Sequence, residues 1–229
     1  MPVISFANPK GGAGKTTSAL LLASELAARG AGVAIVDADP ERWISQWGAL
    51  PGKPDNVTII GEVSEDTIVD VIEEVSARHQ FVIVDLEGTA SLMVANAIGM
   101  SDLVIIPTQG ASMDAKGASK TIKLIRNQAR MAKREIPHAV LLTRVSAAVM
   151  SRSLKNVREQ LDTAGIDVFH ASIVERAAYR DLLDFGGLLG NLDPKQVSNL
   201  EKAVQNAMEF TAEVVAKLKA LQTKQGRAA

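Results

Sequence analysis

A glycine-rich loop near the start of the chain offers the clearest chemistry. Residues 10–17 read Lys-Gly-Gly-Ala-Gly-Lys-Thr-Thr, and they lie between an apolar segment, residues 3–6, and an alanine- and leucine-rich segment, residues 16–28. Glycines let backbone N–H groups converge on phosphate oxygens at a helix start, whose dipole favours anions. Lys15 would reach the β- and γ-phosphates, and the Thr16 hydroxyl would bind Mg²⁺. The loop predicts a site for a nucleotide with magnesium, and the alternative is a plain glycine-rich turn.

Acidic residues follow two later apolar segments. Asp37 and Asp39 come after residues 33–36, and Asp85 comes directly after residues 81–84. Carboxylates at strand ends can bind Mg²⁺ or the waters around it, because hard cations prefer oxygen ligands. The alternative is structural: the first two acids would cap the helix that follows them, and the third would be a bare strand terminus. Both roles can coexist.

The segments that must position these groups alternate between strand and helix. Expected strands occupy residues 3–6, 33–36, 81–84, 103–106, 139–142 and 166–169. Expected helices occupy residues 16–28, 65–78, 113–134, 151–164, 176–185 and 194–221. Fully apolar strands are typical of a parallel sheet that helices cover on both faces. We expect one α/β domain over residues 1–222, with a mostly parallel twisted sheet, and a flexible polar tail at residues 223–229.

Composition excludes several kinds of site. The chain has no cysteine, which rules out disulfides, thiolate zinc sites, iron–sulfur clusters and cysteine nucleophiles. Its three histidines lie far apart, without metal-ligand spacing, and no strong general base is visible. No stretch approaches the roughly 20 apolar residues of a membrane span, and no basic segment precedes an apolar run at the N-terminus. We expect a cytoplasmic protein.

The glycine-rich loop departs from the standard phosphate-binding pattern in one informative way. Pro9 stands where the first glycine belongs, and Lys10 supplies a second lysine. This form resembles the deviant Walker A motif of the ParA/MinD family of ATPases, and the resemblance covers nearly the whole chain. It implies a P-loop NTPase fold with ATP and Mg²⁺ as ligands. It also implies a homodimer when ATP is bound, in which Lys10 reaches the nucleotide of the partner subunit.

The same resemblance assigns roles to further residues. Asp37-Ala38-Asp39-Pro40 is similar to the switch I motif, which implies that Asp39 orients or activates the attacking water. Asp85 matches the Walker B aspartate, and Gly88 matches the switch II turn, where Leu86-Glu87 replaces the usual small residue and proline. The catalytic residues expected by resemblance are Lys10, Lys15 and Asp39. The expected ATP contacts are Lys10, Gly11, Gly12, Ala13, Gly14, Lys15, Thr16, Thr17, Thr143 and Arg144. The expected Mg²⁺ site comprises Thr16, Asp37, Asp39 and Asp85.

Residues 173–180 resemble the segment that closes over the nucleotide or a partner in this family. The segment contains Arg176 and Tyr179, the only tyrosine of the chain. A tyrosine in such a place is as often a packed aromatic as a ligand contact. We leave both interpretations of Tyr179 open.

Charge is distributed unevenly along the chain. Residues 1–115 hold 6 basic and 15 acidic residues, whereas residues 116–229 hold 19 and 11. Seven basic residues and no acidic one lie between positions 116 and 134, and on a helix they share an arc of about 140°. Such a stripe would bind phosphates of DNA without sequence preference, and the alternative is a solvated helix face. The predicted DNA contacts are Lys116, Lys120, Lys123, Arg126, Arg130, Lys133 and Arg134.

The resemblance is greatest to small ParA-type partition ATPases, because no DNA-binding domain precedes the loop. It implies plasmid or chromosome partition by a nucleoid-associated ATP dimer that binds nonspecific DNA, with slow hydrolysis stimulated by a ParB-like centromere-binding partner. One alternative is a ParA-like positioner of protein cargo with an adaptor protein, and another is a conjugative DNA-transfer factor. A MinD-like membrane-cycling ATPase is less favoured. Residues 213–224 lack tryptophan and phenylalanine, so we expect no stable membrane association.

Overall fold

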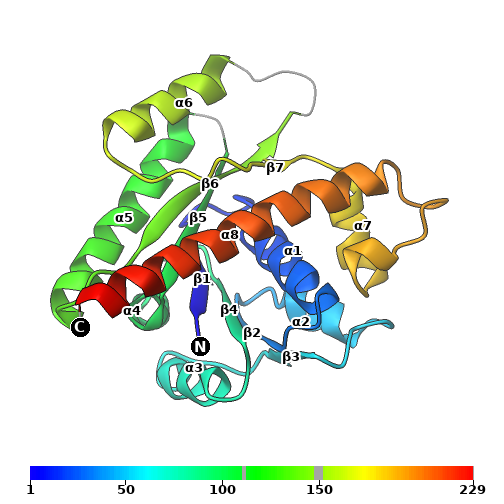
Figure 1. The fold of residues 1–229 in the computed structure, drawn as a ribbon, viewed down its shortest axis with the longest axis horizontal. Coiled ribbons are helices and arrows are strands. Elements are labelled where there is room, and N and C mark those ends of the chain that lie inside the picture. The colour runs from blue at the N-terminus through cyan, green and yellow to red at the C-terminus, as the bar shows by residue number, and fades with distance from the viewer. Residues whose placement is uncertain (110–111, 147–151, 229) are drawn as a thin grey trace.

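The computed structural model describes residues 1–109, 112–146 and 152–228, which form a parallel sheet between two layers of helices (Figure 1). The strands are β1 Val3–Phe6, β2 Val33–Ala38, β3 Val57–Ile60, β4 Phe81–Leu86, β5 Leu103–Gln109, β6 His138–Val145 and β7 Ile173–Val174. The helices are α1 Lys15–Ala28, α2 Trp43–Ala49, α3 Ile68–Ser76, α4 Leu92–Met100, α5 Ser112–Ala132, α6 Arg152–Thr163, α7 Ala177–Phe185, the 3₁₀ turn η1 Leu189–Asn191 and α8 Leu200–Ala228. The predicted α/β class is confirmed.

The strand order places the glycine-rich loop at the centre of the sheet. The order is β3-β2-β4-β1-β5-β6-β7, and all neighbouring strands are parallel. β4 lies between β1 and β2, and its register aligns Asp85 with Phe6 on one side and with Asp37 on the other. The carboxyl ends of parallel strands meet at one edge, where α/β proteins bind ligands. The loop after β1 and two of the predicted carboxylates therefore share that edge.

Alternation along the strands divides the core into two layers. Ile4 and Phe6 of β1 pack with α1, α2, α7 and α8 on one face of the sheet. Val3 packs with α3, α4, α5 and α6 on the opposite face. Successive side chains of a strand point to opposite faces, so a strand that is apolar throughout contributes to both layers. The core is largely aliphatic, although Trp47, Phe169 and Phe210 are also fully buried.

The segment expected to be the last strand, residues 166–169, is not one. Only Val168 pairs with the sheet there, in an isolated bridge to Val140. Phe169 instead packs edge-on against Phe210 of α8, with ring centroids 5.7 Å apart. Residue 169 is therefore apolar because its ring is buried beneath α8, and strand pairing is not needed to explain it. The edge strand is β7, Ile173–Val174, which pairs with β6 four residues later in the chain.

Other boundaries also differ from the prediction. β3, α4 and η1 were missed, and α2 was considered only as a helix that the switch I acids would cap. α4 is apolar on nearly all sides and packs between α3 and α5, so it has no clear amphipathic period. α8 begins later than predicted, at Leu200, and continues to Ala228 through residues expected to form a flexible tail.

Candidate nucleotide-binding site

Asn8 fixes the first half of the glycine-rich loop. Its side chain is buried, its Nδ2 donates to Pro107 O at 2.6 Å, and its Oδ1 accepts from Lys10 N at 2.9 Å. A Cβ atom on Gly117 of α5 would lie 2.9 Å from the same Oδ1, so only glycine leaves Asn8 this space. The bond to Pro107 ties the loop to β5, a role of Asn8 that the sequence did not reveal.

Two strand ends hold the second half of the loop. Gln109 Nε2 at the end of β5 donates to Gly12 O at 2.7 Å, and Thr143 Oγ1 of β6 donates to Ala13 O at 2.7 Å. Gly12 and Gly14 have φ angles of 72° and 94°, a left-handed conformation that glycine adopts without strain. The loop therefore has a defined shape in the absence of ligand, as a phosphate-binding loop requires.

Lys15 begins α1 and is buried, with 6% of its surface exposed. A Cβ atom on Gly88, in the predicted switch II turn, would lie 3.7 Å from Lys15 Nζ and 3.4 Å from Pro9 O. The switch II turn thus lies directly against the loop and its lysine. A Cβ atom at this position would be in ordinary van der Waals contact with the loop.

Asp85 has an unusual environment. Its side chain is fully buried, and neither carboxylate oxygen accepts a hydrogen bond of standard geometry. Burial raises the pKa of Asp85 to about 7, although the Thr16 hydroxyl and the Lys15 ammonium group oppose the increase. Buried polar atoms without partners are rare and indicate a missing ligand. Asp85 is therefore placed to interact with a cation or its water shell.

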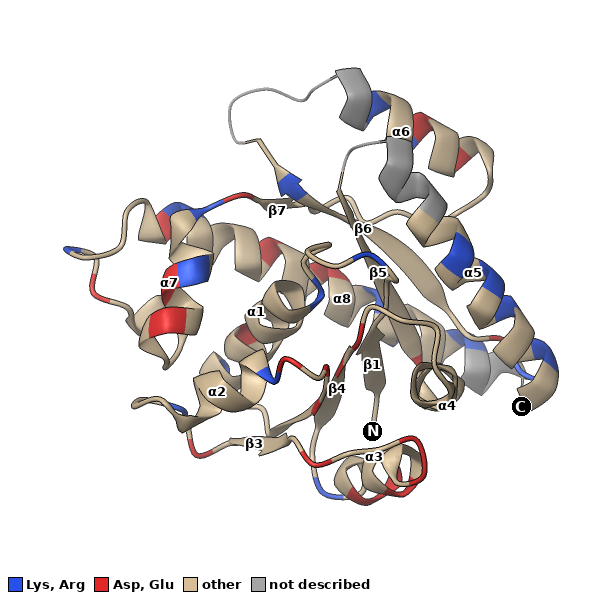
Figure 2. Cartoon of the chain, turned by 180° about the vertical axis from the view of Figure 1, so that it is seen from behind, with Lys and Arg blue, Asp and Glu red and all other residues tan. Residues whose placement is uncertain are grey.

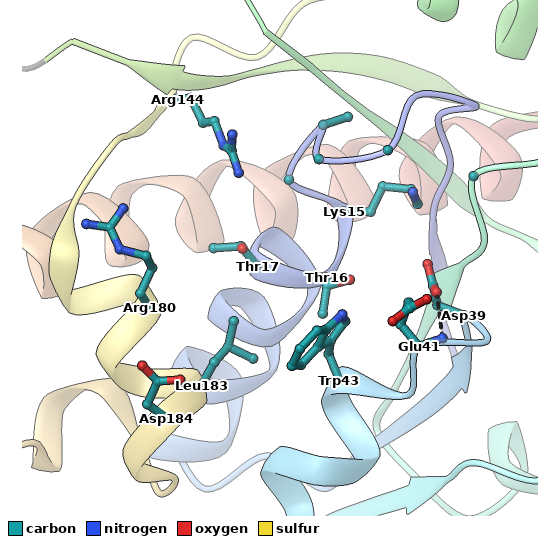
Figure 3. A pocket seen from close by; sticks show the side chains of 15 residues that line it. Lys15, Thr16, Thr17, Asp39, Glu41, Trp43, Arg144, Arg180, Leu183 and Asp184 are labelled. Carbon is teal, nitrogen blue, oxygen red and sulfur yellow. Dashed lines mark hydrogen bonds between the residues drawn. The ribbon is translucent and has the colours of Figure 1, made fainter.

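Asp37 has the helix-capping role considered as the alternative, whereas Asp39 stabilises the turn before the helix. Asp37 Oδ2 accepts from Ser45 N and from Ser45 Oγ, each at 2.7 Å, which fixes the first turn of α2. Asp39 Oδ1 accepts from Glu41 N at 3.1 Å (Figure 3). Asp37 Oδ1 is buried without a partner. Capping by Asp37 therefore uses one oxygen and leaves the other without a hydrogen-bond partner.

These residues fit a magnesium ion bound chiefly by phosphate and water. Among the described residues, no three His, Asp or Glu side chains converge closely enough to hold a metal on their own. Mg²⁺ usually keeps several waters and takes only one or two protein ligands beside substrate phosphates. The Thr16 hydroxyl, with the unpartnered oxygens of Asp37 and Asp85, matches that pattern. A direct cage of three carboxylates does not form here.

A cavity of about 530 Å³ opens over the loop. One end is formed by loop residues 11–17, as predicted for the phosphates, and Arg144 extends over it from the end of β6 (Figure 3). The other walls were not predicted from sequence, except Arg180, which lies in the segment expected to close over the nucleotide or a partner. They consist of side chains from the start of α2 and from α7: Glu41, Trp43, Arg180, Leu183 and Asp184. The short spacing after Asp39 could have indicated the α2 wall, because α2 must begin within a few residues of switch I.

Comparison with known proteins now places the chain. The family model described as VirC1 protein matches residues 1–223. Protein ParA of Rhizobium radiobacter is 38% identical over 218 residues, which span 95% of this chain and 98% of the relative. The chain belongs to the VirC1 and ParA family. It is also 28% identical to protein virC1 of Rhizobium rhizogenes, over 91% of this chain and 94% of that protein.

Solved structures of similar fold extend the comparison. Apo McdA from Cyanothece superposes with a TM-score of 0.73 at 18% identity, covering 91% of this chain and 99% of McdA. MinD of Aquifex aeolicus gives 0.70 at 17% identity, over 94% and 98% of the two chains. At these identities the structures bear on the fold alone. They match a P-loop ATPase fold, as the loop predicted.

The basic stripe of this ParA-family protein lies on α5, as Figure 2 shows. The apolar side of α5, including Ile122 and Ile125, is buried in the core, and the basic side of the helix faces outward. The exposed members are Lys120, Lys123, Arg126, Arg130, Lys133 and Arg134, the last two just beyond the end of α5. The side chain of Lys116 lies outside the part of the chain that the structure describes.

Arg134 has a role that the DNA prediction did not include. Its guanidinium donates to Gly99 O and Ser101 O at the carboxyl end of α4, the second at 2.9 Å. Cations and donors at this end of a helix satisfy carbonyls that lack intrahelical partners. Arg134 therefore joins the end of α5 to α4, and its contribution to a DNA surface stays a prediction.

Tyr179 is a packed aromatic in the ParA-family fold. It is buried, and its hydroxyl lies 3.1 Å from Ala203 O and 3.0 Å from Asn206 Oδ1 of α8. Burial raises its pKa to about 12. The residue thus anchors α7 to α8, and it borders a small hollow of about 80 Å³ beside Thr143 and Arg144.

The C-terminal helix uses its apolar residues for packing. Val214 and Leu218 of α8 are buried in the core, and Val215 packs against it. In the described part of the chain, no helix has the length and apolar character needed to cross a membrane. An apolar face already covered by the sheet is not available to a bilayer.

Proposed function

We propose that this protein is an ATPase for plasmid or chromosome partition. In this proposal an ATP-dependent sandwich dimer binds nonspecific DNA and hydrolyses ATP slowly, with stimulation by a ParB-like partner. The observation that carries it is the exposed basic face of α5 on a chain that also has a complete phosphate-binding loop. The 38% identity to a protein named ParA, over nearly the full length of both chains, supports the same assignment.

The site's residues divide the chemistry among them. Loop N–H groups and Lys15 would bind the phosphates, and Thr16 would hold Mg²⁺ while Asp37 and Asp85 bind its water shell. The ion would neutralise phosphate charge. Asp39 would orient the attacking water, and Lys10 would complete the site of the partner subunit. Catalysis here is mainly positioning and electrostatics, so a slow basal rate is expected without an activator.

Neutralising the stripe should weaken DNA binding without affecting nucleotide binding. The variant carries Lys120→Gln, Lys123→Gln and Arg126→Gln, all exposed positions on α5. If these groups contact phosphates, the negative slope of log K against log salt concentration should become shallower by about 3 units. Fluorescence anisotropy with random duplex DNA and ATP, across a salt series, measures this slope.

A matched control removes three exposed cations elsewhere: Arg78→Gln, Lys195→Gln and Lys202→Gln. It changes the net charge equally and should leave the slope nearly unchanged. Arg134 is kept in both variants because it joins α5 to α4. Equal slopes for the two variants would show that α5 is only a solvated face.

Lys10→Ala should abolish ATP-dependent dimerisation while ADP affinity changes little. Lys10 is exposed beside the loop, whereas Lys15 is buried within it, so the two lysines can serve different subunits. Size-exclusion chromatography with light scattering, with a non-hydrolysable ATP analogue, reports the dimer. Lys53→Ala is a control outside the cavity. A Lys10→Ala variant that still dimerises would contradict the sandwich arrangement.

A second candidate is the positioning of a protein cargo. It is favoured by a relative from Halothiobacillus neapolitanus, named maintenance of carboxysome distribution protein A, which is 28% identical over 78% of this chain and 82% of that protein. The nucleotide site would be the same in both cases. Plasmid retention in a strain lacking the protein separates them, since only partition predicts increased plasmid loss.

A further inference from the structure

Trp43 is an unusually exposed tryptophan. It is 50% exposed and is the first residue of α2, whereas Trp47, one turn later, is 1% exposed in the core. Trp43 lines the cavity over the phosphate-binding loop, and in Figure 3 its ring lies next to Thr16 and between the loop and α7. A large aromatic side chain left half exposed inside a ligand cavity is a candidate ligand contact.

The backbone around Trp43 is held in place from the nucleotide site itself. Asp37 Oδ2 accepts two hydrogen bonds from Ser45, and Arg42 Nη1 donates to Asp37 O at 3.1 Å. Arg42 has a φ of 54°, a left-handed conformation that costs free energy in a non-glycine residue. These bonds fix the backbone at the start of α2. The indole of Trp43 therefore projects into the cavity from a well-defined helix end.

The chemistry of the cavity walls differs from one end to the other. Loop N–H groups and Lys15 would bind the phosphates at one end, and the opposite wall carries the charged side chains Glu41, Arg180 and Asp184. Trp43 and Leu183 of α7 add apolar surface to the same cavity. An indole and an aliphatic side chain offer little to a phosphate or a hydrated ion, but both suit an uncharged ring.

We propose that Trp43 is a nucleotide-contacting residue whose indole packs against the nucleoside part of the bound nucleotide. The inference rests on the proposed ATP binding and adds a specificity contact to it. Residues 143 and 144, the contacts expected for adenine, border the neighbouring hollow. Trp43 therefore adds a second apolar surface, on the side of α2, to the contacts expected from β6.

The test compares ligands with and without a nucleoside. Trp43→Ala should weaken ADP binding by about tenfold in calorimetry, the usual size of one aromatic stacking contact. Magnesium tripolyphosphate, which lacks the nucleoside, should bind Trp43→Ala and the parent protein equally. Trp43→Phe should restore most of the ADP affinity. Phe185→Ala, which removes a 51% exposed aromatic of α7 outside the cavity lining, should change neither affinity.

Intrinsic fluorescence provides a second readout. ADP should quench the tryptophan fluorescence of the parent protein. The quenching should disappear in Trp43→Phe, where buried Trp47 is the remaining tryptophan. Equal loss of ADP and tripolyphosphate binding would overturn the nucleoside contact. So would unchanged ADP affinity combined with loss of ATP-dependent dimerisation, which would place Trp43 at the subunit interface. If the parent protein itself binds no nucleotide, it is the proposed function that fails.

Discussion

Replacing Lys15 with alanine should reduce ATP hydrolysis by at least about a hundredfold, since one transition-state donor is lost. Lys15 is buried at the first position of α1, where the loop N–H groups and Gly88 surround the expected phosphates. ADP affinity should also fall by roughly tenfold to a hundredfold, the usual effect of losing a charge-assisted hydrogen bond. Steady-state phosphate release and calorimetric ADP titration measure the two effects separately.

Lys202→Ala is the matched control for Lys15→Ala. Lys202 is an exposed lysine of α8 outside the cavity lining, so its removal should affect neither hydrolysis nor ADP binding. Circular dichroism should confirm that both variants are folded. Normal hydrolysis by a folded Lys15→Ala variant would show that the glycine-rich loop is not the catalytic site.

Asp85→Asn should stabilise the nucleotide-free protein at alkaline pH, in the presence of a chelator. Burial raises the pKa of Asp85 to about 7, above its value in the unfolded chain. The folded state therefore favours the protonated acid, and stability is lost as the pH rises between the two pKa values. Above pH 7 the cost approaches ~4 kcal/mol, from the difference between about 7 and about 3.9. The amide carries no such charge.

Thermal denaturation from pH 4 to pH 8 checks this prediction. The melting temperature of Asp85→Asn relative to the parent should increase by roughly 10 °C across this range. Asp55→Asn, which replaces an exposed aspartate, should show no such trend. With magnesium and ATP present, the parent protein should have the higher melting temperature, because the amide of Asp85→Asn binds the cation's water shell less well. Parallel pH profiles for Asp85→Asn and the parent would contradict a buried, unpartnered carboxylate.

The parts of the site that are contiguous in sequence could be predicted. The phosphate-binding loop is one such part, because its glycines and Lys15 act through local backbone geometry. Asp85 could be placed because it ends an apolar strand that must lie beside β1. In both cases a short segment carries the whole signal, and the parallel sheet brings the segments together.

The parts that depend on tertiary packing could not be predicted. Gln109 and Asn8 hold the loop through contacts with chain segments about a hundred residues away. Trp43 and Leu183 become neighbours of the loop only when α2 and α7 pack together at the sheet edge. The misplaced last strand has the same origin, because Phe169 is apolar to pack on α8, while residues 166–169 pair with β6 only at the isolated bridge of Val168.

The hydrogen bonds that Asn8, Gln109 and Thr143 make with the loop have a kinetic consequence. They fix the shape of the loop from the ends of β5 and β6. Little conformational entropy is then lost on association, and no slow rearrangement of the loop precedes it. ADP binding should therefore follow simple one-step kinetics, with an observed association rate that rises linearly with ADP concentration.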